Sequence, residues 1–474
     1  MRAWGPLPWL LAAVLAVYLP TLHASLQFDD HRVVTGDPRV ASWTAWWDSM
    51  PAIRPLLRAS YVLGHTFGGT PADFRAFNIA VHALNVVLAL WLLRALGTRC
   101  GLAAPLAERA ARLGAALFAL HPIATEAVTY VSGRSNALSA TFALAALLAW
   151  LHAPQAHRPV RLRALAALMA LCAIATKEHA AMLPLALLAL HFLPREDARG
   201  ASDERRALAL LTAVIAGAGL VLLFATPYAG MLAAALDRHP PWPHALTQAR
   251  GVFALLGHAI LPWTVAVETG LQPAHGDEPL AMAQLACLLA IVCVAIAWLR
   301  RAPAPALAVL WVAIWLLPTH SLFAREDIAN DRQFYLPLLG LAWLVALACV
   351  QHVKPRHDDA PSRTHSRMRE RLAWTAVVAL ALCTLLHNRT YRTEVTYWAA
   401  AVAAAPESAR AANNLGYAYA LTCREDDALR AFRIAIRLDP GFSQARVNAV
   451  LLARGRLFVP DTRACTGLQP PPRA

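Results

Sequence analysis

The feature that most constrains this chain is a series of long apolar runs separated by short polar segments. A helix needs about 20 apolar residues to cross a bilayer. About eleven runs approach that length, at residues 6–24, 74–96, 113–130, 136–152, 162–176, 179–194, 207–226, 280–299, 304–320, 334–352 and 372–388. Only 15% of the residues are charged, against roughly 25% in soluble proteins. We therefore predict an all-α polytopic membrane helix bundle over residues 1–388, and exclude a soluble enzyme, a disordered chain and a disulfide-built secreted module.

The basic residues indicate how these runs are oriented. They gather in alternate loops, and an excess of Lys and Arg marks the cytoplasmic side. This pattern predicts a cytoplasmic N-terminus and explains the net charge of +14 without a nucleic-acid partner. If the weaker stretch 247–267 crossed the membrane, the last two basic clusters would lie outside. We therefore expect a re-entrant or interfacial helix there, and an extracytoplasmic C-terminus.

The first run has a second interpretation. A basic start, an apolar core and residues 22–24 are also compatible with a secretory signal peptide. We favour a membrane span, because the core continues through Tyr18 and Pro20 without a clean cleavage site. Either interpretation places residues 25–58 outside the cytoplasm.

After residue 388 the composition becomes that of a soluble protein, and residues 389–458 form a separate segment. Residues 409–442 fit the tetratricopeptide template, with packing positions Leu415, Gly416, Tyr419, Ala428, Phe432 and Ala435. A stable array needs about three repeats, so we expect this segment to lean on the membrane domain or on a partner. It either binds a protein or acts as a structural cap. The Pro-rich residues 459–474 are expected to be disordered.

The eight cysteines show no metal-ligand spacing. Most lie in apolar runs, where Cys is usually a small buried hydrophobic residue. Cys423 and Cys465 share the polar C-terminal segment, and they could form a disulfide if that segment is extracytoplasmic.

Ionisable residues near lipid are costly, so they mark the candidate site. The first outer loop contains the adjacent acids Asp29 and Asp30. One of them could act as a general base, or the pair could attract a divalent cation; a solvated acidic turn is the alternative. Other charged residues are expected at the same outer level: Arg54, Glu126, Arg134, Lys177, Glu178, Glu326, Asp327, Asp331 and Arg332. We expect these loops to share one cleft.

The second apolar run, 74–96, carries a stripe of polar side chains. Asn78, His82 and Asn85 have the spacing i, i+4, i+7, which places them on one helical face. Such a stripe faces the interior of the bundle, where it either joins helices by hydrogen bonds or lines a ligand site. Both interpretations remain open at this point.

These residues occur within longer matching stretches: FDDHRVVTGDPRV, IRPLLRASY, FNIAVHALN, LFALHPIATEAVTYVSGRSNAL, Lys177-Glu178, DRQFYLP, the linker 388–398 and NNLGYAYAL. In this order, the chain resembles the O-mannosyltransferases that have many membrane spans and C-terminal tetratricopeptide repeats, in the glycosyltransferase C superfamily. The resemblance covers nearly the whole chain. Its Ala- and Arg-rich composition suggests a bacterial member, in which the carrier lipid would be undecaprenyl phosphate.

The resemblance implies transfer of a sugar from a polyprenyl-phosphate carrier to an acceptor hydroxyl on a protein or glycan outside the cytoplasm, with inversion. Asp30 or Asp29 would then be the general base. The donor phosphate would be bound by the basic residues Arg54, Arg134, Lys177 and Arg332. The residues expected to shape the cleft or bind the acceptor are His82, His121, Glu126 and Glu178. Where the family usually has an acid, this chain has Asn136, which weakens a metal or proton role there.

Two other function classes compete with an enzyme. A transporter of a lipid-linked sugar is disfavoured, because the sequence lacks paired Gly/Pro-broken spans in two matching halves. A membrane-anchored scaffold that binds a partner through the repeat would not need the outer-face acids and bases.

Overall fold

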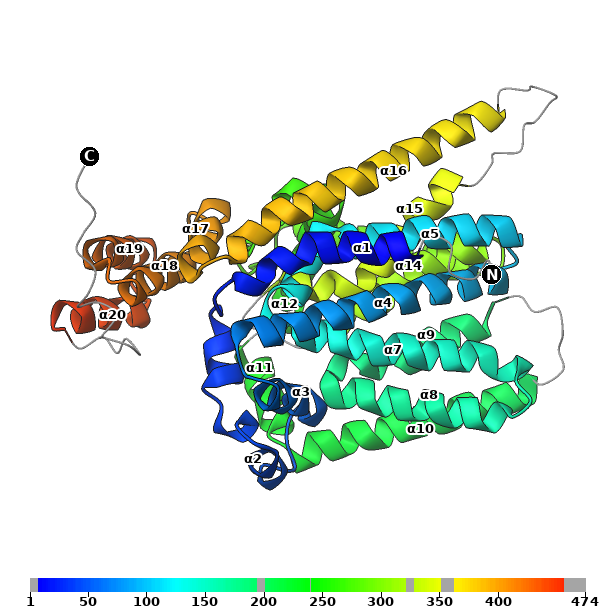
Figure 1. Cartoon of the computed structure of the whole chain (residues 1–474), viewed down its shortest axis with the longest axis horizontal. Helices are drawn as coiled ribbons and strands as arrows, with labels where there is room; N and C mark the ends of the chain where they lie inside the picture. Colours follow the sequence, from blue (N-terminus) through cyan, green and yellow to red (C-terminus); the bar gives the residue numbers. More distant parts are fainter. Residues whose placement is uncertain (1–6, 194–200, 239, 321–327, 351–361, 456–474) are drawn as a thin grey trace.

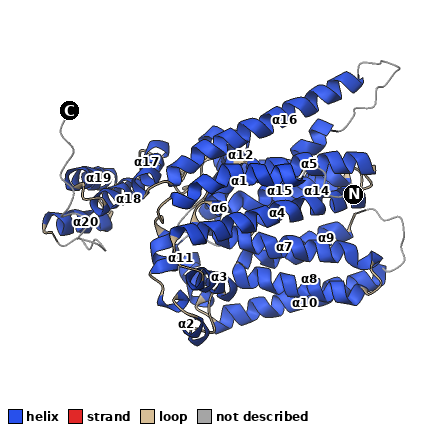
Figure 2. Cartoon of the chain, in the orientation of Figure 1, coloured by secondary structure: helices blue, strands red, loops and turns tan. Residues whose placement is uncertain are grey.

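The computed structural model describes residues 7–193, 201–238, 240–320, 328–350 and 362–455, and all regular structure in these ranges is helical (Figures 1 and 2). Within them, seven segments are long and apolar enough to cross a membrane. They contain α4 (Pro71–Arg99), α7 (Arg134–His152), α8 (Pro159–Thr176), α10 (Ala201–Ala225), α13 (Pro279–Trp298), α15 (Tyr335–Val350) and α16 (Ser362–His387). The chain is therefore a multi-pass membrane protein, and the predicted all-α class is confirmed.

The bundle has a buried centre and a periphery that faces lipid. In the segments that contain α7 and α15, 72% of the 18-residue apolar stretch is buried inside the protein. In α10 and α13 the buried share of that stretch is 11%. Packed between α4 and α15 is α5 (Ala104–Leu120), a helix rich in small residues. At Gly114 an added Cβ would lie 2.9 Å from Leu93 and 3.4 Å from the backbone of Trp343. Small side chains thus let the central helices approach closely, as is usual in membranes.

Four of the predicted spans are not among these seven segments. The run 113–130 contributes only to the end of α5, because His121 adopts an extended backbone before Pro122, as residues that precede proline usually do. The run 179–194 contains α9 (Leu183–His191), whose nine residues are too few for a span. Shorter apolar helices are α1 (Leu7–Tyr18) and α14 (Pro303–Leu316). The number of eleven spans thus remains a prediction.

The stretch 247–267 lies mostly in α12 (Pro241–Ile260), which is not among the span-forming helices found in the described ranges. Exposed tryptophans flank it, with Trp242 at its start and Trp263 just after its end. Tryptophan prefers the membrane–water interface, so these positions favour the expected interfacial or re-entrant helix.

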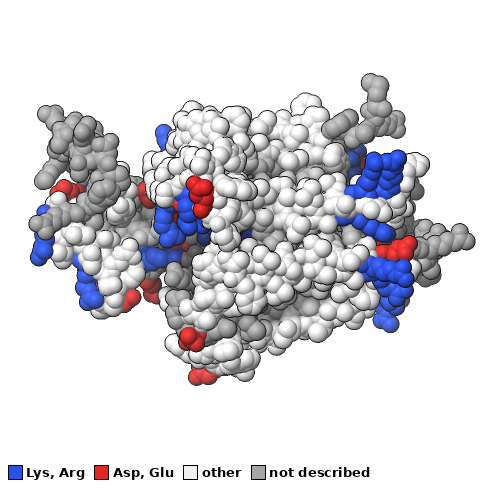
Figure 3. Space-filling model, turned by 90° about the horizontal axis from the view of Figure 1, so that it is seen from below, with Lys and Arg blue, Asp and Glu red and all other residues white. Residues whose placement is uncertain are grey.

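Charge separates the two ends of the bundle. Figure 3 shows a broad middle zone almost free of charged residues, with Lys, Arg, Asp and Glu gathered at its two ends. We call the end that carries α2 (Trp43–Asp48), α3 (Pro55–Thr66) and α11 (Tyr228–Arg238) the site end (Figure 1). It is the end predicted to be extracytoplasmic.

Beyond α16, four helices form a tail beside the site end (Figure 1). They are α17 (Glu394–Ala404), α18 (Ala409–Leu421), α19 (Glu425–Leu438) and α20 (Ser443–Ala453). In the pair α18–α19, a Cβ added at Gly416 would lie 2.7 Å from the ring of Phe432, and Ala428 and Ala435 are buried. These predicted packing positions are therefore internal, while the tetratricopeptide assignment stays a prediction. Cys465 and residues 459–474 lie outside the described residues.

Candidate functional site

The buried acid of the first outer loop is Asp30. Its Oδ2 accepts the backbone N–H of Gln27 at 3.1 Å, and its Oδ1 accepts the hydroxyl and the backbone N–H of Ser132, the latter at 2.7 Å. The carboxyl is fully buried, and burial raises the pKa of Asp30, although these hydrogen bonds and the charge of Arg75 act to lower it. Asp30 therefore anchors the loop to a segment about one hundred residues away.

Its neighbour Asp29 has a different environment. The Asp29 side chain is 32% exposed and lies 3.8 Å from the guanidinium of Arg32. The backbone N–H of Asp29 donates to the hydroxyl of Tyr130 at 3.1 Å. Of the two adjacent carboxylates, only Asp29 is open to an incoming molecule in this arrangement.

The segment between α5 and α7 organises the site. It consists of the short helices η4 (Pro122–Ala124), α6 (Thr125–Val128) and η5 (Val131–Gly133). At Gly133 a Cβ would lie 1.9 Å from the backbone oxygen of Glu126, so this turn requires glycine. Side chains of this segment contact different neighbours: Glu126 contacts Arg332, and Ser132 contacts Asp30.

One of these neighbours is Arg332, which lies in the short helix η9 (Asp331–Phe334). Its Nη1 donates to Glu126 Oε1 at 2.6 Å, and its backbone N–H donates to Glu126 Oε2 at 2.8 Å. The guanidinium of Arg332 lies 5.7 Å from the ring centroid of Tyr130. Tyr130 therefore contacts both the Asp29 backbone and the predicted phosphate-binding residue Arg332.

A second group joins three other predicted residues. Arg54 Nε donates to Glu178 Oε2 at 2.8 Å, and the hydroxyl of Tyr228 donates to the same oxygen at 3.0 Å. Burial alone would raise the pKa of Glu178, but the adjacent Arg54 holds it well below its usual range. Lys177 Nζ, nearly buried, donates to Asn136 Oδ1 at 2.7 Å. The predicted cations at this end thus each have a polar partner.

Arg134 lies apart from both groups. It is fully buried, and its guanidinium donates to Asn78 Oδ1 at 2.6 Å and to the backbone oxygens of Ser60 and Phe74 at 2.9 and 2.8 Å. These contacts join α7 to α3 and α4. In this arrangement Arg134 holds helices together and is not presented to a phosphate.

The polar stripe of α4 also makes contacts between helices. His82 Nδ1 lies 2.7 Å from the hydroxyl of Tyr335, and His82 Nε2 lies 3.0 Å from the backbone oxygen of Ala119. Asn85 donates to the same Tyr335 hydroxyl at 3.0 Å, and both side chains are fully buried. The contacts favour helix packing over the alternative of a ligand site.

His121 and His258 connect α12 to this end of the bundle. His121 Nε2 lies 3.0 Å from the backbone oxygen of Ala259, and His258 Nδ1 lies 2.7 Å from Asp331 Oδ1. His121 therefore shapes the wall between α5 and α12. Glu326 and Asp327, which the sequence places near Asp331, lie outside the described residues.

The linker helix α17 closes the first outer loop from the side of the tail. Glu394 Oε1 accepts the backbone N–H of Phe28 at 3.2 Å, and Glu394 Oε2 lies 3.4 Å from His31 Nε2. A hydrogen bond to Glu394 raises the pKa of His31. The ring of Trp398 meets that of Phe28 edge-on, with centroids 5.1 Å apart.

Sequence reasoning did not single out several of these residues, namely Tyr130, Ser132, His258, Glu394 and Tyr397. Tyr397 stacks on Tyr130 with ring centroids 6.1 Å apart, which brings the tail onto the organising segment. Tyr130 and Ser132 lie inside the longest matching stretch, so that motif was the available signal. Within the described ranges, no three His, Cys, Asp or Glu side chains cluster closely enough to hold a metal ion.

No protein-family model matches the chain. It is 30% identical over 154 residues to the protein O-mannosyl-transferase tmtc2 of Xenopus laevis, covering 29% of this chain and 17% of that protein. It is 33% identical over 158 residues to the protein O-mannosyl-transferase Tmtc2 of Drosophila melanogaster, covering 30% and 16%. A protein O-mannosyl-transferase of Caenorhabditis elegans is 23% identical over 338 residues, covering 69% of this chain and 46% of its own length. The chain thus matches less than half of each of these relatives.

Proposed function

We propose that this chain is a membrane glycosyltransferase that moves a mannose-like sugar from a polyprenyl-phosphate carrier to an acceptor hydroxyl, on a protein or glycan, at the site end. The observation that carries the proposal is the partly exposed Asp29 carboxylate beside the anchored Asp30. Similarity to proteins named O-mannosyl-transferases supports the reaction class.

In this mechanism Asp29 is the general base. As the acceptor oxygen bonds to the anomeric carbon, Asp29 takes the hydroxyl proton, and the bond from that carbon to the phosphate oxygen breaks. Attack opposite the leaving group inverts the anomeric centre, and the polyprenyl phosphate leaves with one more negative charge. General-base assistance contributes about 10²–10⁴-fold. Asp30 positions this base by holding the loop against Ser132.

We assign the donor phosphate to Arg332 and Arg54, whose side chains are both partly exposed. A planar guanidinium can bind two phosphate oxygens at once. Their carboxylate partners, Glu126 and Glu178, fix the orientation of each guanidinium. Lys177 is nearly buried on Asn136, so it acts on the phosphate through charge rather than by contact.

Orientation completes the proposal: the N-terminus is cytoplasmic, and the site end and the tetratricopeptide tail are extracytoplasmic. The source is bacterial, the carrier is undecaprenyl phosphate, and the tail binds a protein partner. A divalent cation bound at the aspartates is a competing way to activate the acceptor. Activity that is lost after chelation and restored by Mg²⁺ or Mn²⁺ would favour that route.

The test compares glycoproteins and surface glycans from cells that lack the gene and carry wild type, Asp29→Asn, Asp30→Asn or Asp48→Asn. Glycopeptide mass spectrometry reads the adducts. Asp48 is an exposed acid of the same loop, so Asp48→Asn is the matched control. We expect a hexose adduct with wild type and Asp48→Asn, and at least a hundredfold loss with Asp29→Asn.

Other outcomes separate the alternatives. If Asp30→Asn abolishes transfer and Asp29→Asn does not, the roles of the two acids are reversed. If no glycan differs between any of the cells, the glycosyltransferase proposal fails. A partner recovered equally with wild type and Asp29→Asn would then indicate the scaffold, and accumulation of a lipid-linked sugar on the cytoplasmic side would indicate the transporter.

A further inference from the structure

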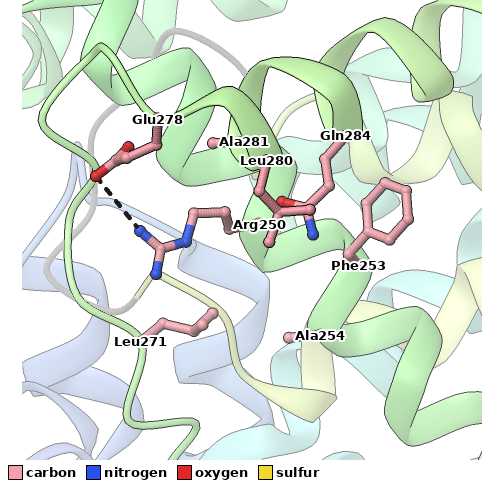
Figure 4. A pocket seen from close by; sticks show the side chains of 8 residues that line it. All are labelled: Arg250, Phe253, Ala254, Leu271, Glu278, Leu280, Ala281 and Gln284. Carbon is pink, nitrogen blue, oxygen red and sulfur yellow. Dashed lines mark ion pairs between the residues drawn. The ribbon is translucent and has the colours of Figure 1, made fainter.

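A groove outside the candidate site lies between α12 and α13. It has a volume of about 620 Å³, and Figure 4 shows the side chains around it. The wall is mostly apolar, with Phe253 and Ala254 from α12, Leu271 from the following loop, and Leu280 and Ala281 at the start of α13. Since only 11% of the apolar stretch of α13 is buried inside the protein, this wall borders the lipid-facing surface.

The polar side chains of the groove are one cation (Arg250), one anion (Glu278) and the amide of Gln284. Arg250 Nη1 lies 4.0 Å from Glu278 Oε1, the outer limit of an ion pair, and the Arg250 side chain is 32% exposed. Oε1 of Glu278 also accepts the backbone N–H of His275 at 3.0 Å. Within the described part of the chain, the buried oxygens Glu278 Oε2 and Gln284 Oε1 have no hydrogen-bond partner.

Such an arrangement fits a particular ligand chemistry. The weakly paired guanidinium suits a phosphate oxygen, and the buried acceptors suit hydroxyl donors, because an unpaired buried acceptor is costly. A bare inorganic phosphate would not cover the apolar wall. The occupant therefore combines an acyl chain, a phosphate and hydroxyl groups.

The location favours a bilayer lipid over the glycosyl donor. Exposed Trp242 and Trp263 flank α12 and mark the headgroup level. On α12, the residue that reaches the site end is His258, eight positions beyond Arg250, which is about 12 Å along a helix. A phosphate bound to Arg250 would therefore lie about 12 Å along α12 from the residue that contacts Asp331, the neighbour of the proposed phosphate-binding Arg332.

We propose that the α12–α13 groove binds a membrane phospholipid whose phosphate carries a polyol headgroup. The phosphate pairs with Arg250, the headgroup hydroxyls donate to Glu278 and Gln284, and one acyl chain lies along the apolar wall. This lipid fastens the interfacial helix α12 to the bilayer. The site is independent of glycosyl transfer.

The experiment is native mass spectrometry of the purified full chain with acyl-matched phosphatidylglycerol, phosphatidylmethanol or phosphatidylcholine. Phosphatidylmethanol has the charge of phosphatidylglycerol but lacks its hydroxyls. We expect phosphatidylglycerol to be retained best. Arg250→Gln should lower its retention about tenfold or more, and Gln284→Leu should abolish the preference over phosphatidylmethanol. Arg300→Gln, just beyond the C-terminal end of α13, is the matched control and should bind like wild type.

Each contrary outcome overturns the proposal. Equal losses for Arg250→Gln and Arg300→Gln, with unchanged melting temperatures, would show that bulk charge and not the groove binds lipid. Displacement of phosphatidylglycerol by a polyprenyl-phosphate sugar would assign the groove to the donor. If Arg250→Gln does not fold, the comparison of phosphatidylglycerol with phosphatidylmethanol on Gln284→Leu still decides: an unchanged preference refutes the site. Because lipid retention is read directly, failure here leaves the proposed glycosyl transfer untouched.

Discussion

Replacing Ser132 by Ala tests whether the buried carboxylate of Asp30 anchors the acidic loop. The substitution removes the hydroxyl that donates to Asp30 Oδ1 and keeps the backbone N–H bond at 2.7 Å. A hydrogen bond to a charged group is worth about 1.5–3 kcal/mol, against about 0.5–1.5 kcal/mol between neutral groups. Since 1.4 kcal/mol is a factor of ten, local opening should increase about 10- to 150-fold when Asp30 is ionised.

The ionisation of Asp30 determines how the effect of Ser132→Ala changes with pH. Burial raises the pKa of Asp30, so the carboxyl ionises above the usual aspartate range. Below that pKa both proteins carry a neutral carboxyl, and the variant should open only about 2- to 13-fold more often. As the pH rises through the pKa, the difference between the two proteins should grow.

Hydrogen exchange read by mass spectrometry, on peptides covering residues 25–36 and 126–136, measures this local opening. Wild type and variant are compared at each pH from about 4 to about 8, so the intrinsic exchange rate cancels. Ser139→Ala is the control, because the Ser139 hydroxyl donates to the backbone oxygen of Ala173 and to no ionisable group. A Ser132→Ala effect that is independent of pH, or larger at low pH, would refute the anchoring role of Asp30.

Three further perturbations test the packing around the site. Gly133→Ala places a Cβ 1.9 Å from the Glu126 backbone oxygen, and it should lower the free energy of unfolding by more than the usual 1–3 kcal/mol of overpacking. The melting temperature of this variant should fall well below that of Gly217→Ala, where a Cβ meets nothing within 4 Å. Arg332→Met leaves the buried Glu126 carboxylate without its main partner and should lower the free energy of unfolding by about 3–5 kcal/mol. Adding Glu126→Gln to this variant should restore part of the lost stability, as measured by thermal unfolding. If the second substitution restores nothing, the result argues against the ion pair. Trp398→Ala removes a buried ring that contacts the first outer loop and should lower the free energy of unfolding by about 3–5 kcal/mol. Limited proteolysis should then release the tail sooner than in wild type. Equal rates of release would contradict the packing of Trp398 against the loop.

Most of the fold could be predicted from the order of apolar runs. In lipid the backbone must satisfy its own hydrogen bonds, so a long apolar run has little choice but to be a helix; α4 and α13 follow this rule. Run length alone could not set the helix ends, since Pro122 stops α5 inside a run that remains apolar. The tail helices could be predicted as well, because the small Gly416 on α18 leaves room for the ring of Phe432 on α19.

The sequence by itself determined which residue types lie at the site end: adjacent acids in one loop and bases in several others. Only the tertiary structure decided what each of them does. Asp29 and Asp30 are chemically identical neighbours, yet a contact with Ser132, 102 positions away, buries one and leaves the other open. Arg134 and Arg332 were equivalent candidates until packing enclosed the first among α3, α4 and α7 and placed the second beside Tyr130. A side chain's charge is encoded locally, but its burial and its partners depend on helices that are distant in the chain.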